Sequence, residues 1–274
     1  MYTYRLLGTL ENLDPLTPDL WEAGCQGLSE DNGTVLAYFD APFELPFGGT
    51  WVKADDTDWI AAYRASLEAV TIGKVTITPP WLEQPSTSAI QLLLEPGLAF
   101  GTGQHQTTQM AILALQEHDL KTLKVLDVGA GTGILAMVAA KLGAAMVYGV
   151  DNDPSTVAVA LENAAQNGVQ IEFKAGLLED MLPQAPFDLI VANLFAELHA
   201  LLMPQYKAAL AQNGILVLTG ILAGTDQADA GEQITWDTSS GRETLVLESL
   251  AIHGFVLRQR RQMADWVLLE ATKL

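Results

Sequence analysis

The feature that most constrains this chain is a regular alternation of strand-like and helix-like segments from residue 107 onward. Short apolar runs such as KVLDV are separated by longer segments with helical spacing. Strands that alternate with helices in this way predict a parallel, doubly wound α/β sheet of the Rossmann-like kind. The expected helices are 107–118, 133–142, 154–167 and 196–211, and the expected strands are 124–128, 146–150, 171–175, 187–193 and 214–220.

The segments on either side of this alternation are less regular. KVTITP and AIQLLLEP, which come before it, are interpreted as two strands. GFVLRQRR and ADWVLLEA, near the C-terminus, predict a β-hairpin that closes the sheet. Residues 224–243, which precede this hairpin, are rich in Asp, Thr, Ser and Gly and predict a solvated loop.

The first fifty residues predict a separate, small α+β domain. TYRLL and TVLAYFD have the pattern of strands, DPLTPDLWEAG predicts a turn and a short helix, and Gly48-Gly49 marks a boundary. The next segment, DDTDWIAAYRASLEA, has apolar residues at helical spacing. We therefore expect a domain over 1–54, a linker helix over 55–69 and a larger domain over 70–274. A helix packed wholly within one domain is the alternative.

Charge and composition exclude several classes of protein. With 14 basic and 33 acidic residues, the net charge is −19, so direct binding to nucleic-acid phosphates is not expected. This charge favours a cationic partner such as a lysine-rich protein, and an acidic surface kept for solubility is the alternative. No signal peptide or membrane span is expected. A single cysteine and four histidines without metal-ligand spacing suit a cytoplasmic protein without a metal.

A glycine cluster, LDVGAGTG, follows the first strand of the alternation, with glycines at 129, 131 and 133. Glycine permits positive φ and a close approach of backbone N–H groups to a ligand. The dinucleotide pattern G-x-G-x-x-G fails when it is counted from Gly129, because the sixth residue is Ile134. Counted from Gly131, only the relaxed form ending in alanine fits. The glycines alone are therefore weak evidence for any one nucleotide.

Two acidic residues near this cluster favour S-adenosyl-L-methionine as the ligand. Asp127 precedes the glycines, where a carboxylate repels a pyrophosphate and suits the amino group of a methionine tail. Asp151 ends the next strand, where a carboxylate can accept both ribose hydroxyls. A dinucleotide site and a purely structural turn are the alternatives.

A third element is VANLFAE, in which Asn193 follows the fourth strand of the alternation. Ligands of open α/β sheets bind at this carboxyl edge. An asparagine at a strand end is often only a turn or helix cap. In amino-group methyltransferases, however, an asparagine here accepts hydrogen bonds from the target nitrogen, together with the next backbone carbonyl, which is that of Leu194.

The motifs EPGLAFGTGQHQTT, LDVGAGTGILA, VDNDP, VANL and LTGIL together resemble the ribosomal protein methyltransferases of the PrmA type. The resemblance covers most of the chain, and F-G-T-G-x-H-x-T-T is its most specific motif. It implies a class I S-adenosylmethionine-dependent methyltransferase with a small N-terminal domain that recognises the substrate. The implied substrate is the basic large-subunit ribosomal protein eleven, methylated on lysine ε-amines and the N-terminal α-amine.

The resemblance also implies roles for particular residues. Asn193 and the Leu194 carbonyl would orient the amine, and a loop at 100–103 would close over the cofactor. The implied cofactor-binding residues are Phe100, Gly101, Thr102, Gly103, Thr107, Thr108, Asp127, Gly129, Gly131, Gly133, Asp151 and Asn193.

Several points stay open at the level of sequence. A nicotinamide-dependent oxidoreductase and a non-catalytic module that binds S-adenosylmethionine are the rival functions. His105 matches the family's histidine and would position the loop or act on the proton of the amine. His118, His199 and His253 are expected to be structural or exposed. The polar insert at 224–243 is longer than the family resemblance leads us to expect.

Overall fold

The structure is a computed structural model that describes residues 2–9, 20, 23–25, 27–31, 33–53, 68–82, 89–94, 101–224 and 242–273. The chain divides into two compact units, 1–67 and 68–274. The expected linker helix falls almost wholly outside the described residues, as do the short helix expected in DPLTPDLWEAG, Phe100 and nearly all of the polar insert. No helix within the described ranges is long and apolar enough to cross a bilayer.

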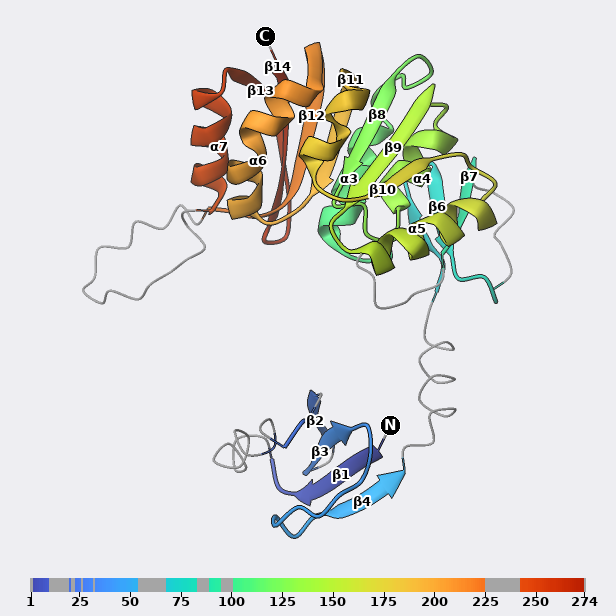
Figure 1. Cartoon of the computed structure of the whole chain (residues 1–274), viewed down its shortest axis with the longest axis vertical. Helices are drawn as coiled ribbons and strands as arrows, with labels where there is room; N and C mark the ends of the chain where they lie inside the picture. Colours follow the sequence, from blue (N-terminus) through green and yellow to red (C-terminus); the bar gives the residue numbers. More distant parts are fainter. Residues whose placement is uncertain are drawn as a thin grey trace, which may run out of the picture. The chain divides into compact units, whose positions relative to one another are not determined.

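The first unit contains a four-stranded antiparallel sheet in the order β2-β3-β1-β4 (Figure 1). Its strands are β1 (Tyr2–Leu7), β2 (Gly27–Asp31), β3 (Thr34–Phe39) and β4 (Thr50–Lys53). Alternate residues of β3, Val35, Ala37 and Phe39, are buried against Tyr4 and Leu6 of β1. The two apolar strands expected from sequence are therefore confirmed, and the more polar β2 and β4 extend the sheet on both sides.

The second unit is built on a seven-stranded sheet in the order β10-β9-β8-β11-β12-β14-β13. Its strands are β8 (Lys124–Val128), β9 (Met146–Asp151), β10 (Glu172–Ala175), β11 (Phe187–Asn193), β12 (Leu210–Leu222), β13 (Phe255–Met263) and β14 (Trp266–Lys273). The first five strands in this order are parallel, and β14 runs antiparallel to both of its neighbours. The expected doubly wound sheet with a C-terminal hairpin is confirmed.

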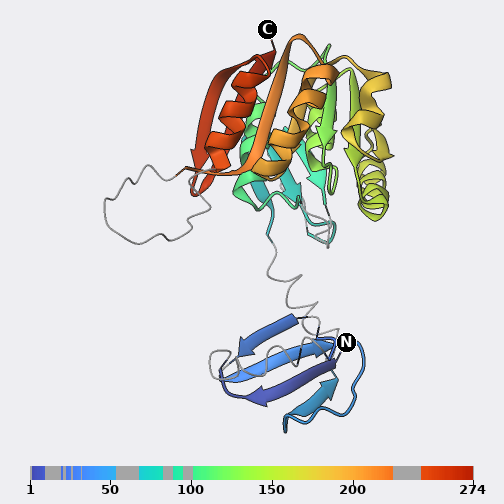
Figure 2. The same ribbon diagram turned by 60° about the vertical axis from the view of Figure 1, so that its left-hand side comes forward.

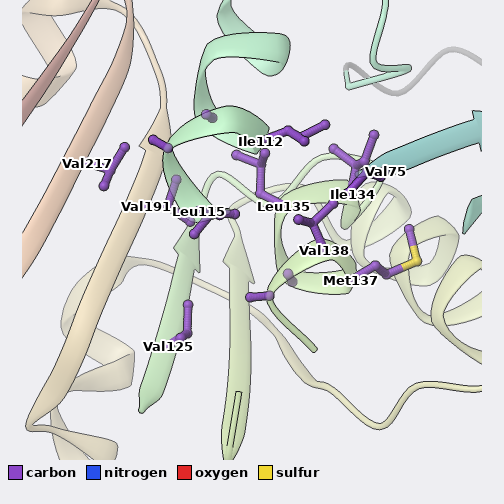
Figure 3. Close-up of a cluster of buried hydrophobic side chains, with 14 of the residues drawn as sticks. Val75, Ile112, Leu115, Val125, Ile134, Leu135, Met137, Val138, Val191 and Val217 are labelled. Atoms are coloured by element: carbon purple, nitrogen blue, oxygen red, sulfur yellow. The ribbon is translucent and has the colours of Figure 1, made fainter. Parts of the chain in front are cut away.

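Helices cover both faces of this sheet (Figure 1, Figure 2). They are α3 (Gln106–Leu115), α4 (Ile134–Lys141), α5 (Pro154–Gln166), the 3-10 helix η2 (Leu178–Gln184), α6 (Ala196–Ala209) and α7 (Arg242–Ile252). Because side chains alternate along a strand, Val125 and Val191 pack with α3 and α4 (Figure 3), whereas Leu126 and Ile190 pack with α6 and α7. The central strands are therefore buried on both faces.

A small sheet in the order β5-β6-β7 extends the core on the α3 and α4 side. Its strands are β5 (Val70–Ile72), β6 (Val75–Thr78) and β7 (Ile90–Leu93). Asn167 at the end of α5 binds both backbone groups of Leu93, at 2.7 Å each, which fixes β7 to the main unit. The two strands expected here are confirmed, and β5 was not expected.

Candidate active site

A cavity of about 380 Å³ lies at the carboxyl ends of the parallel strands. One side, which we call the β9 wall, comprises Gly129, Gly131, Asp151, Asn152 and Thr156. A second part, the β11 wall, comprises Asn193, Leu194, Phe195 and Gly220. His105, Thr107 and Trp266 complete the lining. The cavity therefore brings together residues from all five of the sequence motifs that carry the resemblance, at the edge where open α/β sheets bind ligands.

The glycine turn of the β9 wall fixes the Asp151 carboxylate. Gly129 and Gly131 both have positive φ, at 72° and 55°. The Gly131 N–H donates to Asp151 Oδ2 at 3.0 Å, and the Asp153 N–H donates to Oδ1 at 3.1 Å. Each carboxylate oxygen still has a lone pair for a ligand hydroxyl. The turn thus holds an acidic acceptor in place at the end of β9.

The same turn is poorly suited to a pyrophosphate. The N–H groups of Gly129 and Ala130 both donate to the Val150 carbonyl, at 2.9 and 3.1 Å. The Gly133 N–H donates to the Ala130 carbonyl at 2.8 Å. A phosphate site at a helix start requires backbone N–H groups that point at the ligand. These N–H groups are already engaged within the protein, which argues against the nicotinamide alternative.

Asp127 lies behind the cavity and is fully buried. Its Oδ2 accepts the Ala136 N–H of α4 at 3.0 Å, while Oδ1 has no hydrogen-bond partner within the described part of the chain. Burial raises the pKa of Asp127 to about 8; the hydrogen bond from Ala136 acts in the opposite direction, and the charge of Asp151 adds a smaller increase. One carboxyl oxygen is therefore left unpaired beneath the glycine turn.

The segment 101–103 and the glycine cluster at 129–133 are in direct contact. Thr132 Oγ1 donates to the Gly101 carbonyl at 2.7 Å. A Cβ on Gly101, where φ is 106°, would lie 2.9 Å from Thr132 Oγ1, and a Cβ on Gly103 would lie 2.3 Å from Ile77 Cδ1. Both glycines are buried, Thr102 is half-buried, and none of residues 101–103 lines the cavity. The described part of the expected closing loop, residues 101–103, thus packs beside the glycine cluster at 129–133.

His105 caps α3 and forms part of the cavity lining. Its Nδ1 accepts the Thr107 N–H at 3.4 Å and lies 2.7 Å from Thr107 Oγ1. Its ring meets the edge of Trp266, with the ring centroids 4.9 Å apart. His105 therefore fixes the start of α3 against β14, and Thr107 faces the cavity from the first turn of that helix.

Contacts on the β11 wall orient Asn193. Its Nδ2 donates to the buried Thr108 Oγ1 at 3.4 Å, which leaves Oδ1 available as an acceptor. The adjacent Leu194 N–H donates to the Thr219 carbonyl at 3.0 Å. Thr108 therefore supports Asn193 from behind instead of lining the cavity itself.

Gly220 is required by the close approach of the Leu194 backbone. A Cβ at Gly220, where φ is 86°, would lie 2.4 Å from the Leu194 carbonyl oxygen and 3.0 Å from Asn193 Oδ1. The motif LTGIL was noticed in the sequence, but this role depends on the alignment of Asn193 with Thr219 in the sheet. Sequence reasoning also missed four other lining residues: Asn152, Thr156, Phe195 and Trp266.

Known proteins resemble this chain along most of its length. A family model described as "Ribosomal protein L11 methyltransferase (PrmA)" matches residues 39–273. A ribosomal protein L11 methyltransferase from Thermus thermophilus is 44% identical over 269 residues, which cover 98% of each chain. A protein of the same name from Deinococcus radiodurans is 46% identical over 232 residues, covering 81% of this chain and 85% of that protein.

A solved structure shares the fold. The crystal structure of a ribosomal protein L11 methylase from Lactobacillus delbrueckii subsp. bulgaricus aligns with a TM-score of 0.65 and 33% sequence identity. The alignment covers 76% of this chain and 100% of that chain.

Proposed function

Since the chain belongs to the PrmA family of ribosomal protein L11 methyltransferases, we propose that it transfers methyl groups from S-adenosylmethionine to ribosomal protein L11. The acceptors are lysine ε-amino groups and the N-terminal α-amino group. The observation that carries this proposal is the β11 wall, where Asn193 and Leu194 line the same cavity as Asp151. The substrate and the enzyme meet in the cytoplasm.

The residues of the β9 wall fit S-adenosylmethionine. The fixed Asp151 carboxylate has free lone pairs for the two ribose hydroxyls. The unpaired Oδ1 of Asp127 is a buried acceptor near the glycine turn, which suits the ammonium group of the methionine tail. When bound, the cofactor supplies a methyl group on a positively charged sulfur. Gly129 is required because a Cβ there would lie 2.5 Å from Leu194 Cδ2.

The β11 wall would orient the incoming amine. Asn193 Oδ1 and the Leu194 carbonyl accept its N–H bonds and so aim the nitrogen lone pair across the cavity. A free lysine has a pKa of about 10.4, so less than about 0.1% is neutral near pH 7. Deprotonation at that pH costs about 4 to 5 kcal/mol. A neighbouring positive charge disfavours the ammonium form and offsets part of this cost.

The cavity holds no side chain suited to act as a strong base. Among the described lining residues, only His105 and Asp151 carry an acidic or basic side chain. His105 Nδ1 is engaged with Thr107, and both carboxylate oxygens of Asp151 already accept backbone N–H groups. Proximity and orientation therefore drive the reaction, and the amine loses its proton to solvent.

The first 54 residues would recognise the protein substrate. The composition break at Gly48-Gly49 and the separate antiparallel sheet support this assignment, as does the linker helix proposed for 55–69. A fragment comprising 69–274 keeps the whole seven-stranded sheet and should bind S-adenosylmethionine with nearly unchanged affinity in calorimetry. Its methylation of L11 should be strongly reduced. A fragment that methylates L11 as fast as the full chain would show that this assignment is wrong.

Mass spectrometry of purified L11 after incubation with the enzyme tests the proposed function. L11 should gain methyl groups only when S-adenosylmethionine is present, and peptide mapping identifies the modified amines. Thermal-shift measurements with S-adenosylmethionine and with NAD distinguish the proposed methyltransferase from the oxidoreductase alternative. If L11 gains no mass while the protein still binds S-adenosylmethionine, the non-catalytic binding module becomes the better description.

A further inference from the structure

His199 is a buried polar residue that the mechanism above does not use. It lies in the first turn of α6 and is fully enclosed, with 0% of its surface exposed. Its Nε2 lies 2.9 Å from the Thr219 carbonyl oxygen, and its Nδ1 lies 3.3 Å from Tyr206 Oη. Tyr206 and Thr219 are also fully buried. The three residues form a polar network directly behind the β11 wall, and His199 is also in hydrogen-bonding contact with the Leu194 backbone.

The direction of each hydrogen bond in this network follows from the chemistry of its members. Burial lowers the pKa of His199 to about 4, so its imidazole is neutral near pH 7. Burial raises the pKa of Tyr206 above its usual range, so its hydroxyl stays protonated. A carbonyl can only accept, and therefore Nε2 carries the hydrogen and donates to Thr219. Nδ1 then accepts the hydrogen bond from the Tyr206 hydroxyl.

The carbonyl held by His199 is the same one that holds Leu194. The Thr219 carbonyl also accepts the Leu194 N–H, at 3.0 Å. The next residue, Gly220, lies so close to the Leu194 carbonyl that a Cβ would reach within 2.4 Å of that oxygen. The peptide joining Thr219 and Gly220 is thus the surface against which the Leu194 backbone rests. A shift of this peptide would move the Leu194 carbonyl and the neighbouring Asn193.

We propose that His199 is a positioning residue for methyl transfer, which fixes the Thr219 carbonyl and through it the Leu194 carbonyl and Asn193 at the cavity. The inference rests on the proposed function, because these two acceptors matter only if an amine binds there. The role requires a donor at the position of Nε2. A buried apolar side chain would fill the same space and leave the Thr219 carbonyl without that second hydrogen bond.

Three substitutions of His199 separate positioning from simple packing. In His199→Gln the side-chain amide can place an N–H near the position of Nε2, toward Thr219. In His199→Asn the shorter amide reaches only the position of Nδ1, toward Tyr206. His199→Leu fills the space without a donor. Tyr206→Phe removes the hydroxyl that holds the imidazole in the required tautomer.

Steady-state methylation of L11 by the full chain, with calorimetric binding of S-adenosylmethionine and thermal unfolding, gives the readout. We expect kcat to fall roughly 10- to 100-fold in His199→Leu and His199→Asn, as for groups that orient a reacting partner. In His199→Gln, kcat should stay within about threefold of wild type, and Tyr206→Phe should fall between these limits. Cofactor affinity and the KM for L11 should change little in every variant that folds.

Three outcomes would overturn the inference while leaving the proposed function standing. One is a His199→Leu enzyme with wild-type kcat. Another is an equal loss in His199→Gln and His199→Leu, since the donor would then not matter. The third is a drop in thermal stability with no change in kcat for the folded protein. If the wild-type enzyme itself does not methylate L11, the proposed function and this inference fail together.

Discussion

The two walls of the cavity both present hydrogen-bond acceptors, but only one of them is charged. On the β9 wall the acceptor is the carboxylate of Asp151, held by backbone N–H groups. On the β11 wall, which Asn193 and Leu194 line, the acceptors that we propose are neutral: the Asn193 amide oxygen and the Leu194 carbonyl. A charged acceptor suits hydroxyl groups, which carry no lone pair that must be kept free for reaction.

Neutral acceptors suit a nucleophilic amine for a physical reason. A carboxylate beside an amine stabilises its ammonium form and raises its pKa. The protonated nitrogen has no lone pair to attack a methyl carbon. Carbonyl oxygens orient the N–H bonds with much less stabilisation of the cation. The difference between the walls therefore indicates which side receives the amine, and the predictions below test that difference.

Substitutions of Asn193 should have the largest effect on the rate of methylation. Asn193→Ala removes one acceptor and should lower kcat and kcat/KM together by roughly 10- to 1,000-fold, as for other positioning groups.

Asn193→Asp keeps an acceptor but places a negative charge beside the amine, and should be slower than Asn193→Ala near pH 7. Because the defect of Asn193→Asp is protonation of the amine, the rate of this variant should rise more steeply with pH than the rate of Asn193→Ala. Rate–pH profiles of the two variants would contradict this explanation if they were parallel.

Removing the charged acceptor of the β9 wall should affect binding. Asp151→Ala should weaken the binding of S-adenosylmethionine by about 1 to 3 kcal/mol, the cost of leaving buried polar groups unpaired. Calorimetry measures this loss directly.

Asp153→Ala is the matched control. Asp153 is an exposed cap of α5, two residues further along the chain and outside the cavity lining. Its loss costs helix stability but should leave cofactor affinity unchanged. An equal loss of affinity in both variants would mean that the β9 turn, and not the Asp151 carboxylate, binds the ligand.

The last prediction concerns folding stability, not activity, and the carboxyl group beneath the β9 wall. The pKa of Asp127 is raised from 3.8 to about 8, so its contribution to stability is complete below pH 3.8 and is lost as pH rises toward 8. Between pH 3.8 and about pH 8, the free energy of unfolding of the wild type should fall relative to that of Asp127→Asn by about 1.4 kcal/mol per pH unit. Urea unfolding of both proteins without cofactor, across this pH range, measures the difference. A difference that is constant with pH would show that Asp127 is already ionised in the folded protein.

The central strands of the large unit could be predicted almost to the residue. The strands expected at 124–128 and 187–193 coincide with β8 and β11, because buried parallel strands appear as short, mainly apolar runs. The short strands β2, β4 and β5 were not predicted, since GLSED and TWVK are partly exposed and lack a clear alternation. The start of β12 at Leu210 was also missed, where the pairing with β11 is irregular.

The site was predictable where its residues lie within one motif. Gly129, Asp151 and Asn193 follow directly from strand ends, and the structure places all three at one cavity. Gly220 and Trp266 enter the site only through the sheet register, which pairs Asn193 with Thr219 and Leu222 with Trp266. The contact of Thr108 with Asn193 could not be predicted, because the depth of a helix start depends on tertiary packing, and the role of Thr108 at the cofactor stays a prediction.

A crossed measurement on the two walls tests the account most directly. Single-turnover methylation of L11 at saturating S-adenosylmethionine, together with calorimetric binding of that cofactor, is measured for Asn193→Ala and Asp151→Ala. We expect Asn193→Ala to react slowly with nearly normal cofactor affinity, and Asp151→Ala to bind weakly but react at close to the wild-type rate once saturated. The account is contradicted if Asn193→Ala reacts at the wild-type rate when saturated, or if the two variants show the same pattern of losses.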